Sequence, residues 1–260
     1  MLSAVAGVGG GVLMVPFLYA VYAGTQVTPS AQTVVAHATS LGVAFVTSSI
    51  GTWRYGLARA IAWRPAAAYA LPGVFSAFVV ARILTKVGEA HWVRAAFGGF
   101  LLFSAWDLAR RARQRRVEQD TTPATHSWGW LVAVGFVGGA LSALLGIGGG
   151  LIAVPVLLYV GKLPIKSVAP TALAGVCLTT LSGGLGYLTA GEGPPVSSWM
   201  AGFLDLRMAL PLALGAAVTV PLGVRVNRQA SPPTLYWLFA TIFAGIGLWL
   251  LVAWRSGQQG

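Results

Sequence analysis

Charged residues are scarce in this chain: only 9% of its 260 residues are Asp, Glu, Lys or Arg, and only six are acidic. A soluble domain carries about 25% charged residues, so this chain has too few to cover a water-exposed surface. The deficit excludes an ordinary soluble globule. It also argues against nucleic acid as the partner that explains the net charge of +11, because the basic residues lie between apolar runs, where they determine membrane topology.

Patterns typical of metal sites and enzymes are also missing. The single cysteine, Cys177, cannot form an intramolecular disulfide, and the three histidines are scattered rather than clustered. No G-x-S-x-G nucleophile motif occurs. Two glycine clusters fail the G-x-G-x-x-G nucleotide-binding pattern, because Val12 and Leu151 stand where its last glycine is required. We therefore expect no enzyme activity, no metal and no cofactor.

Long apolar runs make up most of the chain, and 56% of the residues are hydrophobic. The runs are continuous, whereas the strands of a membrane β-barrel alternate apolar and polar residues. A helix needs roughly 20 apolar residues to cross a bilayer, so the runs predict an all-α polytopic membrane protein with about 7–8 transmembrane segments. The runs lie at about 2–22, 33–52, 66–84, 92–109, 128–160, 168–190, 206–224 and 234–254.

A charged segment divides these runs into two groups of four. Five arginines lie between positions 110 and 116, and the polar stretch EQDTTPATHS follows them. Because Lys and Arg mark cytoplasmic loops, we expect a first transmembrane repeat at 1–112, a cytoplasmic linker at 113–127 and a second repeat at 128–260. In a plain eight-span arrangement, Arg82, Lys86, Lys162 and Lys166 would fall on the side opposite this linker, so charge alone does not fix the orientation.

The two halves repeat each other. Residues 3–18 match residues 142–157 at nine of sixteen positions, and later pairs keep the same order along the chain. This pattern indicates a duplicated four-segment unit. The first half lacks the apolar stretch that precedes the second glycine cluster, so we expect the true start to lie upstream of Met1; the alternative is that the protein functions without that helix. The later pairs include Thr39 and Thr171, Leu41 and Leu173, Gly51 and Gly183, Tyr55 and Tyr187, Arg64 and Arg207, and Arg82 and Arg225.

The glycine clusters GVGGG and GIGGG predict a break in a membrane helix in each half. Broken backbone at membrane depth persists only where it is buried in protein or lines a wet cavity. Free N–H groups at the positive end of the following short helix favour an anion, so we expect two backbone cradles that face one anion site; close helix packing through small residues is the alternative. The cradle residues would be Gly7, Gly9, Gly10, Gly11, Gly146, Gly148, Gly149 and Gly150. The segment 128–160 would then be a full helix, a break and a short second helix.

The sequence also resembles a known family. GVGGGVLMVP with AHATSLGVAF, and GIGGGLIAVP with APTALAGV, resemble the two signature blocks of the TauE/SafE family. The resemblance implies an inner-membrane protein with duplicated halves that moves sulfite, sulfoacetate or other sulfur-containing anions, often outward. Thr39, Ser40 and Thr171 match the second block, and their hydroxyls are expected to bond substrate oxygens. The alternative is a bond to their own helix backbone.

Other polar side chains are candidates for supporting roles. His37 is a candidate proton relay, although its repeat partner is Ala169. Tyr55 and Tyr187 are expected as aromatic residues of the membrane interface. Three arginines near segment ends are candidates for anion capture, or alternatively for anchoring at the lipid headgroups. These are Arg54, Arg64 and Arg207.

No acidic residue lies in the middle of an apolar run, whereas proton- and sodium-driven carriers usually hold a carboxylate at depth. The membrane potential supplies about 2.3 kcal/mol per charge per 100 mV, which is enough to drive anion export without a coupled ion. We therefore expect facilitated export of a small anion. A membrane-embedded partner subunit without transport activity of its own is the alternative, and the sequence leaves the oligomeric state open.

Overall fold

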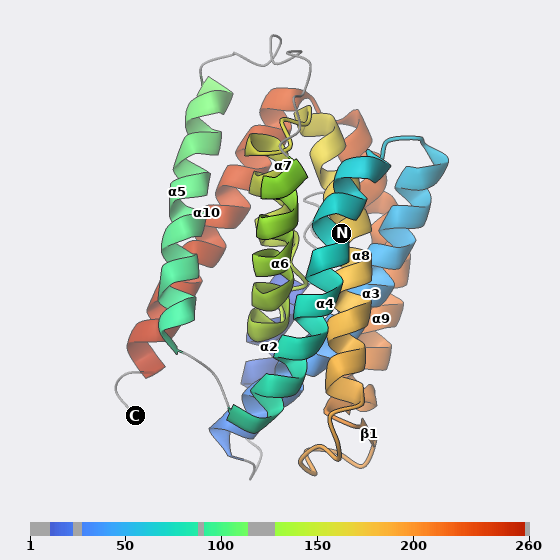
Figure 1. The fold of residues 1–260 in the computed structure, drawn as a ribbon, viewed down its shortest axis with the longest axis vertical. Helices are drawn as coiled ribbons and strands as arrows, with labels where there is room; N and C mark the ends of the chain where they lie inside the picture. Colours follow the sequence, from blue (N-terminus) through green and yellow to red (C-terminus); the bar gives the residue numbers. More distant parts are fainter. Residues whose placement is uncertain (1–10, 23–27, 88–90, 114–127, 258–260) are drawn as a thin grey trace.

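A computed structural model describes residues 11–22, 28–87, 91–113 and 128–257, and these residues form a bundle of helices (Figure 1). Each predicted apolar run contains a described helix, so the all-α prediction is confirmed. The helices are α2 (Gly11–Tyr22), α3 (Pro29–Leu57), α4 (Trp63–Val87), α5 (His91–Arg113), α6 (Trp128–Leu145), α7 (Gly150–Tyr159), α8 (Ile165–Leu188), α9 (Leu206–Gln229) and α10 (Pro232–Gly257). Two short antiparallel strands, β1 (Met200–Ala201) and β2 (Leu204–Asp205), precede α9.

Five of the described helices are long and apolar enough to cross a membrane. This finding supports a multi-pass membrane protein, while the total of 7–8 segments stays a prediction. The five spans are Ser30–Leu57, Trp63–Lys86, Ile165–Leu188, Leu206–Gln229 and Pro232–Val252. The apolar helices α6 and α7 are shorter, because a single long apolar run is divided between them.

The helices α3 and α8 form the centre of the bundle. In each of them, 72% of the most apolar window is buried, against 39% for α4 and 28% for α9. The central pair packs together; α4 packs against α8 and against α6, and α9 packs against α3. The helices α5 and α10 pack mainly against each other and stand at one edge of the bundle (Figure 1).

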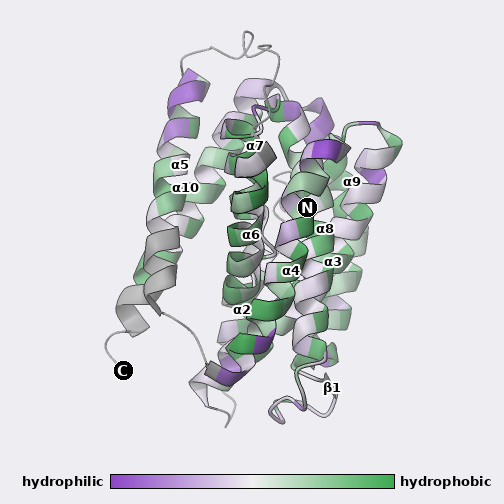
Figure 2. Ribbon diagram, viewed as in Figure 1, coloured by the Kyte–Doolittle hydropathy of each residue, from purple (hydrophilic) through white to green (hydrophobic). Residues whose placement is uncertain are grey.

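Many large apolar side chains are exposed on the outside of the bundle, as they are in a protein surrounded by lipid. Figure 2 shows hydrophobic residues along the helices and hydrophilic ones mainly near the helix ends. The exposed apolar side chains form stripes at every fourth position, which is the spacing that places residues on one face of a helix. One stripe on α4 consists of Leu71, Phe75, Val79 and Ile83. A second stripe on α9 consists of Leu210, Leu214, Val218 and Leu222.

The C-terminal ends of α5 and α7 meet at the end of the bundle where the linker begins. The guanidinium of Arg111 lies 5.1 Å from the centroid of the Tyr159 ring, and that of Arg113 lies 5.7 Å from the Trp237 ring at the start of α10. Because α7 turns back after the break, Lys162 and Lys166 follow it at this same end. The plain eight-span placement of these two lysines, opposite the linker, is therefore wrong.

Candidate functional site

The second glycine cluster forms a sharp break between α6 and α7. The φ angles of Gly146, Gly148 and Gly149 are +65°, +83° and +72°, values that residues with a side chain rarely adopt. All five residues from 146 to 150 are buried. The predicted arrangement of a full helix, a break and a short helix is therefore confirmed for this half.

The main chain of this break is only partly hydrogen-bonded within the part of the chain that the structure describes. The N–H groups of Ile152 and Ala153 both donate to Gly149 O, at 3.1 and 2.9 Å, and start α7. By contrast, the N–H groups of Ile147, Gly148 and Gly149 donate to no acceptor among the described residues. They precede the N-terminus of α7, which carries the positive end of its helix dipole. This arrangement favours a negatively charged ligand.

The break lies directly against the start of α2 in the first half. A Cβ atom on Gly11 would lie 2.7 Å from Gly146 O, so only glycine fits there without a shift. Ser40 Oγ donates to Gly146 O at 2.8 Å and lies 3.5 Å from Gly11 O. Ser40 thus ties the described ends of both glycine clusters together. The other first-half cradle residues, Gly7, Gly9 and Gly10, lie outside the described residues.

His37 packs on the break from α3. A Cβ atom on Gly146 would lie 2.6 Å from His37 Cδ2, so the imidazole fills the space that a side chain would need. His37 is buried, and its Nε2 lies 2.6 Å from the Tyr19 hydroxyl. The structure therefore places this candidate relay beside the glycine break.

Three further side chains at the break escaped the sequence analysis. Tyr69 Oη donates to Gly149 O at 3.3 Å. A Cβ atom on Gly149 would lie 3.3 Å from Ser142 Oγ, a buried hydroxyl with no hydrogen-bond partner among the described residues. A Cβ atom on Gly148 would lie 3.0 Å from Thr180 Cγ2. Of these three, only Ser142 could have been identified from the sequence, because the repeat pairs it with Ser3.

Thr39 and Thr171 are buried but bond to main-chain groups at helix starts. Thr39 Oγ1 accepts from the N–H of Asp205, just before α9, at 3.0 Å. Thr171 Oγ1 accepts from the N–H of Ala62, just before α4, at 3.1 Å. Each hydroxyl therefore connects a central helix to the start of an outer helix. Of the three predicted hydroxyls, Ser40 alone bonds to the glycine break.

The three candidate arginines do not converge on one site. Arg54 and Arg64 are exposed near the α3–α4 connection, and Arg207 is exposed in the first turn of α9. The guanidinium of Arg54 lies 5.2 Å from the Trp53 ring centroid. Two of these cations thus lie at one end of the bundle and the third at the other.

The prediction of Tyr55 and Tyr187 as interface aromatics is wrong. Both side chains are fully buried, because they extend from the central helices α3 and α8 into the protein. Tyr187 Oη donates to Ala143 O in α6 at 3.0 Å. The repeat pairs these tyrosines because both are core residues.

Asp205 is a buried carboxylate that the sequence analysis did not single out. It accepts from Tyr22 Oη at 3.0 Å and from Ser197 Oγ at 2.7 Å, and it caps α9 by accepting from the N–H of Arg207. It thereby joins the end of α2 to the start of α9.

Within the described part of the chain, no three His, Cys, Asp or Glu side chains gather as metal ligands would.

Comparisons with known proteins agree with a membrane transporter. The sequence model of the family described as Sulfite exporter TauE/SafE matches residues 1–250. The chain is 26% identical over 255 residues to the "Probable membrane transporter protein MJ0441" of Methanocaldococcus jannaschii, covering 97% of this chain and 91% of that protein. It is 25% identical over 262 residues to the "Probable membrane transporter protein YunE" of Bacillus subtilis, covering 94% and 90%. No solved structure matches the chain.

Proposed function

Because the chain belongs to the Sulfite exporter TauE/SafE family, we propose that this membrane transporter exports small sulfur-containing anions across the cell inner membrane. Sulfite, sulfoacetate and related organosulfonates are the proposed substrates. The observation that carries the proposal is the run of three main-chain N–H groups, from Ile147 to Gly149, that donate to no described acceptor. Such groups at a helix N-terminus are suited to the oxygens of a sulfite or sulfonate group.

The substrate site is proposed to lie at the glycine breaks. Glycine lets a ligand approach the backbone closely, and the buried hydroxyl of Ser142 lies beside Gly149. Ser40 would hold the second cradle against the first, because it bonds to Gly146 O. In the described conformation, neighbouring side chains close around the break, so a substrate would enter only after a movement of the bundle. The proposed cradle residues are Gly7, Gly9, Gly10, Gly11, Gly146, Gly148, Gly149 and Gly150, with Thr39, Ser40 and Thr171 on the two central helices.

Two halves of inverted orientation would permit such a movement of the bundle. The proposed repeats are 1–112 and 128–260, joined by the linker at 113–127. A Cβ atom on Gly51 would lie 2.6 Å from a Leu173 methyl group, and one on Gly183 would lie 3.3 Å from a Leu41 methyl group. Since the repeat pairs Gly51 with Gly183 and Leu41 with Leu173, these contacts are equivalent and relate α3 to an antiparallel α8. Inverted repeats around a central site are a common basis of alternating access.

The linker end is proposed to face the cytoplasm, because most of the described basic residues gather there. The basic residues at this end are Arg54, Arg59, Arg64, Arg110, Arg111, Arg113, Lys162, Lys166, Arg225 and Arg228. Arg54 and Arg64 would attract the anion at this end, and Arg207 would lie at its exit. A divalent anion leaving at 100 mV gains about 4.6 kcal/mol. In a proton-coupled version of the proposal, His37 would be the relay, because it is buried against Gly146.

The test is flux through the purified chain in proteoliposomes. With an imposed potential, we expect the protein to release trapped sulfite and sulfoacetate faster than protein-free vesicles do. Vesicles with the Gly148→Ala variant, which we expect to be inactive, serve as the matched control. If the correctly inserted wild-type chain moves neither anion, the export proposal is wrong and the partner-subunit alternative replaces it.

A further inference from the structure

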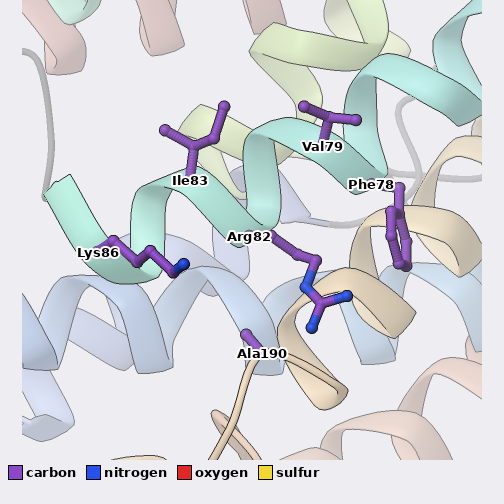
Figure 3. A pocket seen from close by; sticks show the side chains of 6 residues that line it. All are labelled: Phe78, Val79, Arg82, Ile83, Lys86 and Ala190. Atoms are coloured by element: carbon purple, nitrogen blue, oxygen red, sulfur yellow. The ribbon is translucent and has the colours of Figure 1, made fainter.

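A cavity of about 380 Å³ lies at the end of α4 that is farther from the linker. Figure 3 shows its wall, which α4 provides together with the segment that follows α8. The candidate membrane span within α4 ends at Lys86, which would bring this end of the cavity close to the lipid headgroups. It is lined by Phe78, Val79, Arg82, Ile83, Lys86 and Ala190, and none of these residues belongs to the glycine break.

Two positive side chains project into this region. Arg82 and Lys86 are one helical turn apart, both are exposed, and both extend from α4 toward Ala190 (Figure 3). Within the described part of the chain, neither forms an ion pair with a carboxylate. Two uncompensated cations on one helical face attract a ligand with a negative charge.

Arg82 is held in position by the protein rather than extending freely into water. Its Nη2 donates to Thr189 O at 2.8 Å, and its guanidinium lies 5.6 Å from the centroid of the Phe78 ring. A guanidinium has five N–H donors in a fixed plane, so the bond to Thr189 leaves several donors for a phosphate group. A side chain that served only as a membrane anchor would need neither of these contacts.

The apolar part of the cavity continues into the lipid-facing stripe of α4. Leu71, Phe75, Val79 and Ile83 are 67%, 65%, 36% and 49% exposed, and the last two line the cavity. The stripe therefore leads from the middle of the span to the two cations. A hydrocarbon chain lying along it would bring an attached headgroup to Arg82 and Lys86.

We propose that this cavity binds an anionic phospholipid, with its phosphate at Arg82 and Lys86 and one acyl chain along the α4 stripe. The combination of two cations with a continuous apolar track selects a lipid over a free anion, which has nothing to place on the track. The site is separate from the glycine break, and its existence does not depend on the proposed transport of sulfur anions.

The experiment compares dioleoyl phosphatidylglycerol with dioleoyl phosphatidylcholine, which have the same chains but differ in charge. Native mass spectrometry of the purified full chain in detergent counts bound lipid, and a melting curve measures the stabilisation that binding gives. We expect tighter binding of the anionic lipid. A basic residue that holds the bound headgroup contributes about 1 kcal/mol, or about fivefold in affinity. Lys86→Gln should therefore weaken binding about fivefold and the double variant Arg82→Gln/Lys86→Gln about 25-fold.

Arg225→Gln is the matched control, because the repeat pairs Arg225 with Arg82 and its side chain is exposed near the end of α9. It should keep wild-type affinity for phosphatidylglycerol. Lys86→Gln alone carries the test if the double variant does not fold, because no hydrogen bond of Lys86 exists among the described residues. Equal binding of the two lipids, unchanged binding by Lys86→Gln, or an equal loss in Arg225→Gln would overturn the proposal. So would an equal stabilisation by glycerol phosphate, which would indicate a free-anion site.

Discussion

Thr39 Oγ1 accepts a hydrogen bond from the main-chain N–H of Asp205 at 3.0 Å, and this bond joins the two halves of the chain. Thr171 Oγ1 accepts the equivalent bond from Ala62 at 3.1 Å. The offset that pairs Arg64 with Arg207 also pairs Ala62 with Asp205. Each central helix therefore positions the start of an outer helix that belongs to the opposite half, and the halves interlock.

Replacement of either threonine by valine should destabilise the protein. Thr39→Val and Thr171→Val keep the side-chain shape but leave a main-chain N–H unsatisfied, which costs about 1–3 kcal/mol for a buried group. We expect a lower melting temperature in detergent for each variant, and recovery in Thr39→Ser and Thr171→Ser.

The control for these variants is Thr241→Val, because Thr241 is an exposed residue of α10 that bonds only within its own helix. This variant should melt as the wild type does. If the buried and exposed threonines respond alike, the inter-half bonds do not hold the outer helices in place.

Gly148→Ala should abolish anion flux in proteoliposomes. The φ of Gly148 is +83°, and a residue with a Cβ atom loses roughly 1–2 kcal/mol in the left-handed region. The new methyl group would also lie 3.0 Å from Thr180 Cγ2, beside the free N–H groups. We expect at least a tenfold loss of sulfite flux in a protein that still inserts and purifies as a single species.

Gly184→Ala is the matched control, because Gly184 lies in α8 with open space where a Cβ would be. It should transport at the wild-type rate. A Gly148→Ala protein that transports normally would contradict the cradle, and one that never reaches the membrane would show that the glycine serves packing.

The apolar runs and the duplicated glycine clusters were enough to predict the helices and the break between α6 and α7. Both features follow from local chemistry, since hydrophobic length sets the spans and glycine permits a positive φ. The return of α7 toward the linker, by contrast, depends on what α7 packs against. Lys162 and Lys166 were therefore placed on the wrong side when each run was treated as one straight span.

The candidate site was harder to predict than the fold because its polar groups come from distant segments. Asp205 lies outside every predicted apolar run, yet its carboxylate is buried and accepts hydrogen bonds from Tyr22 and Ser197 in the structure. Tyrosine is a residue type typical of membrane interfaces. Tyr55 and Tyr187 are nevertheless buried, because α3 and α8 lie at the centre of the bundle. A single sequence gives residue types and spacing, whereas these roles depend on which helices become neighbours.

Ser142→Ala separates a substrate ligand from a structural hydroxyl. Its Oγ is buried without a partner among the described residues, so its removal breaks no described hydrogen bond, and we expect an unchanged or slightly higher melting temperature. If the hydroxyl bonds the anion, the loss of about 1 kcal/mol should raise the KM for sulfite about fivefold.

Ser104→Ala provides the comparison, because Ser104 in α5 is a second buried serine with no partner among the described residues. Its KM should match that of the wild type. A lower melting temperature of Ser142→Ala with an unchanged KM would assign this hydroxyl to packing.

Transport driven by the membrane potential should not respond to a pH gradient. At 100 mV the bias on a divalent anion is about 4.6 kcal/mol, or about a thousandfold accumulation, and no coupled proton is needed. Sulfoacetate is the appropriate substrate, because both of its acidic groups stay ionised near neutral pH. Its flux at a clamped potential should therefore be the same with and without a pH difference across the vesicle membrane, in the wild type and in His37→Gln alike. Flux that follows the pH gradient in the wild type, and ceases to do so in His37→Gln, would replace facilitated export with proton coupling through His37.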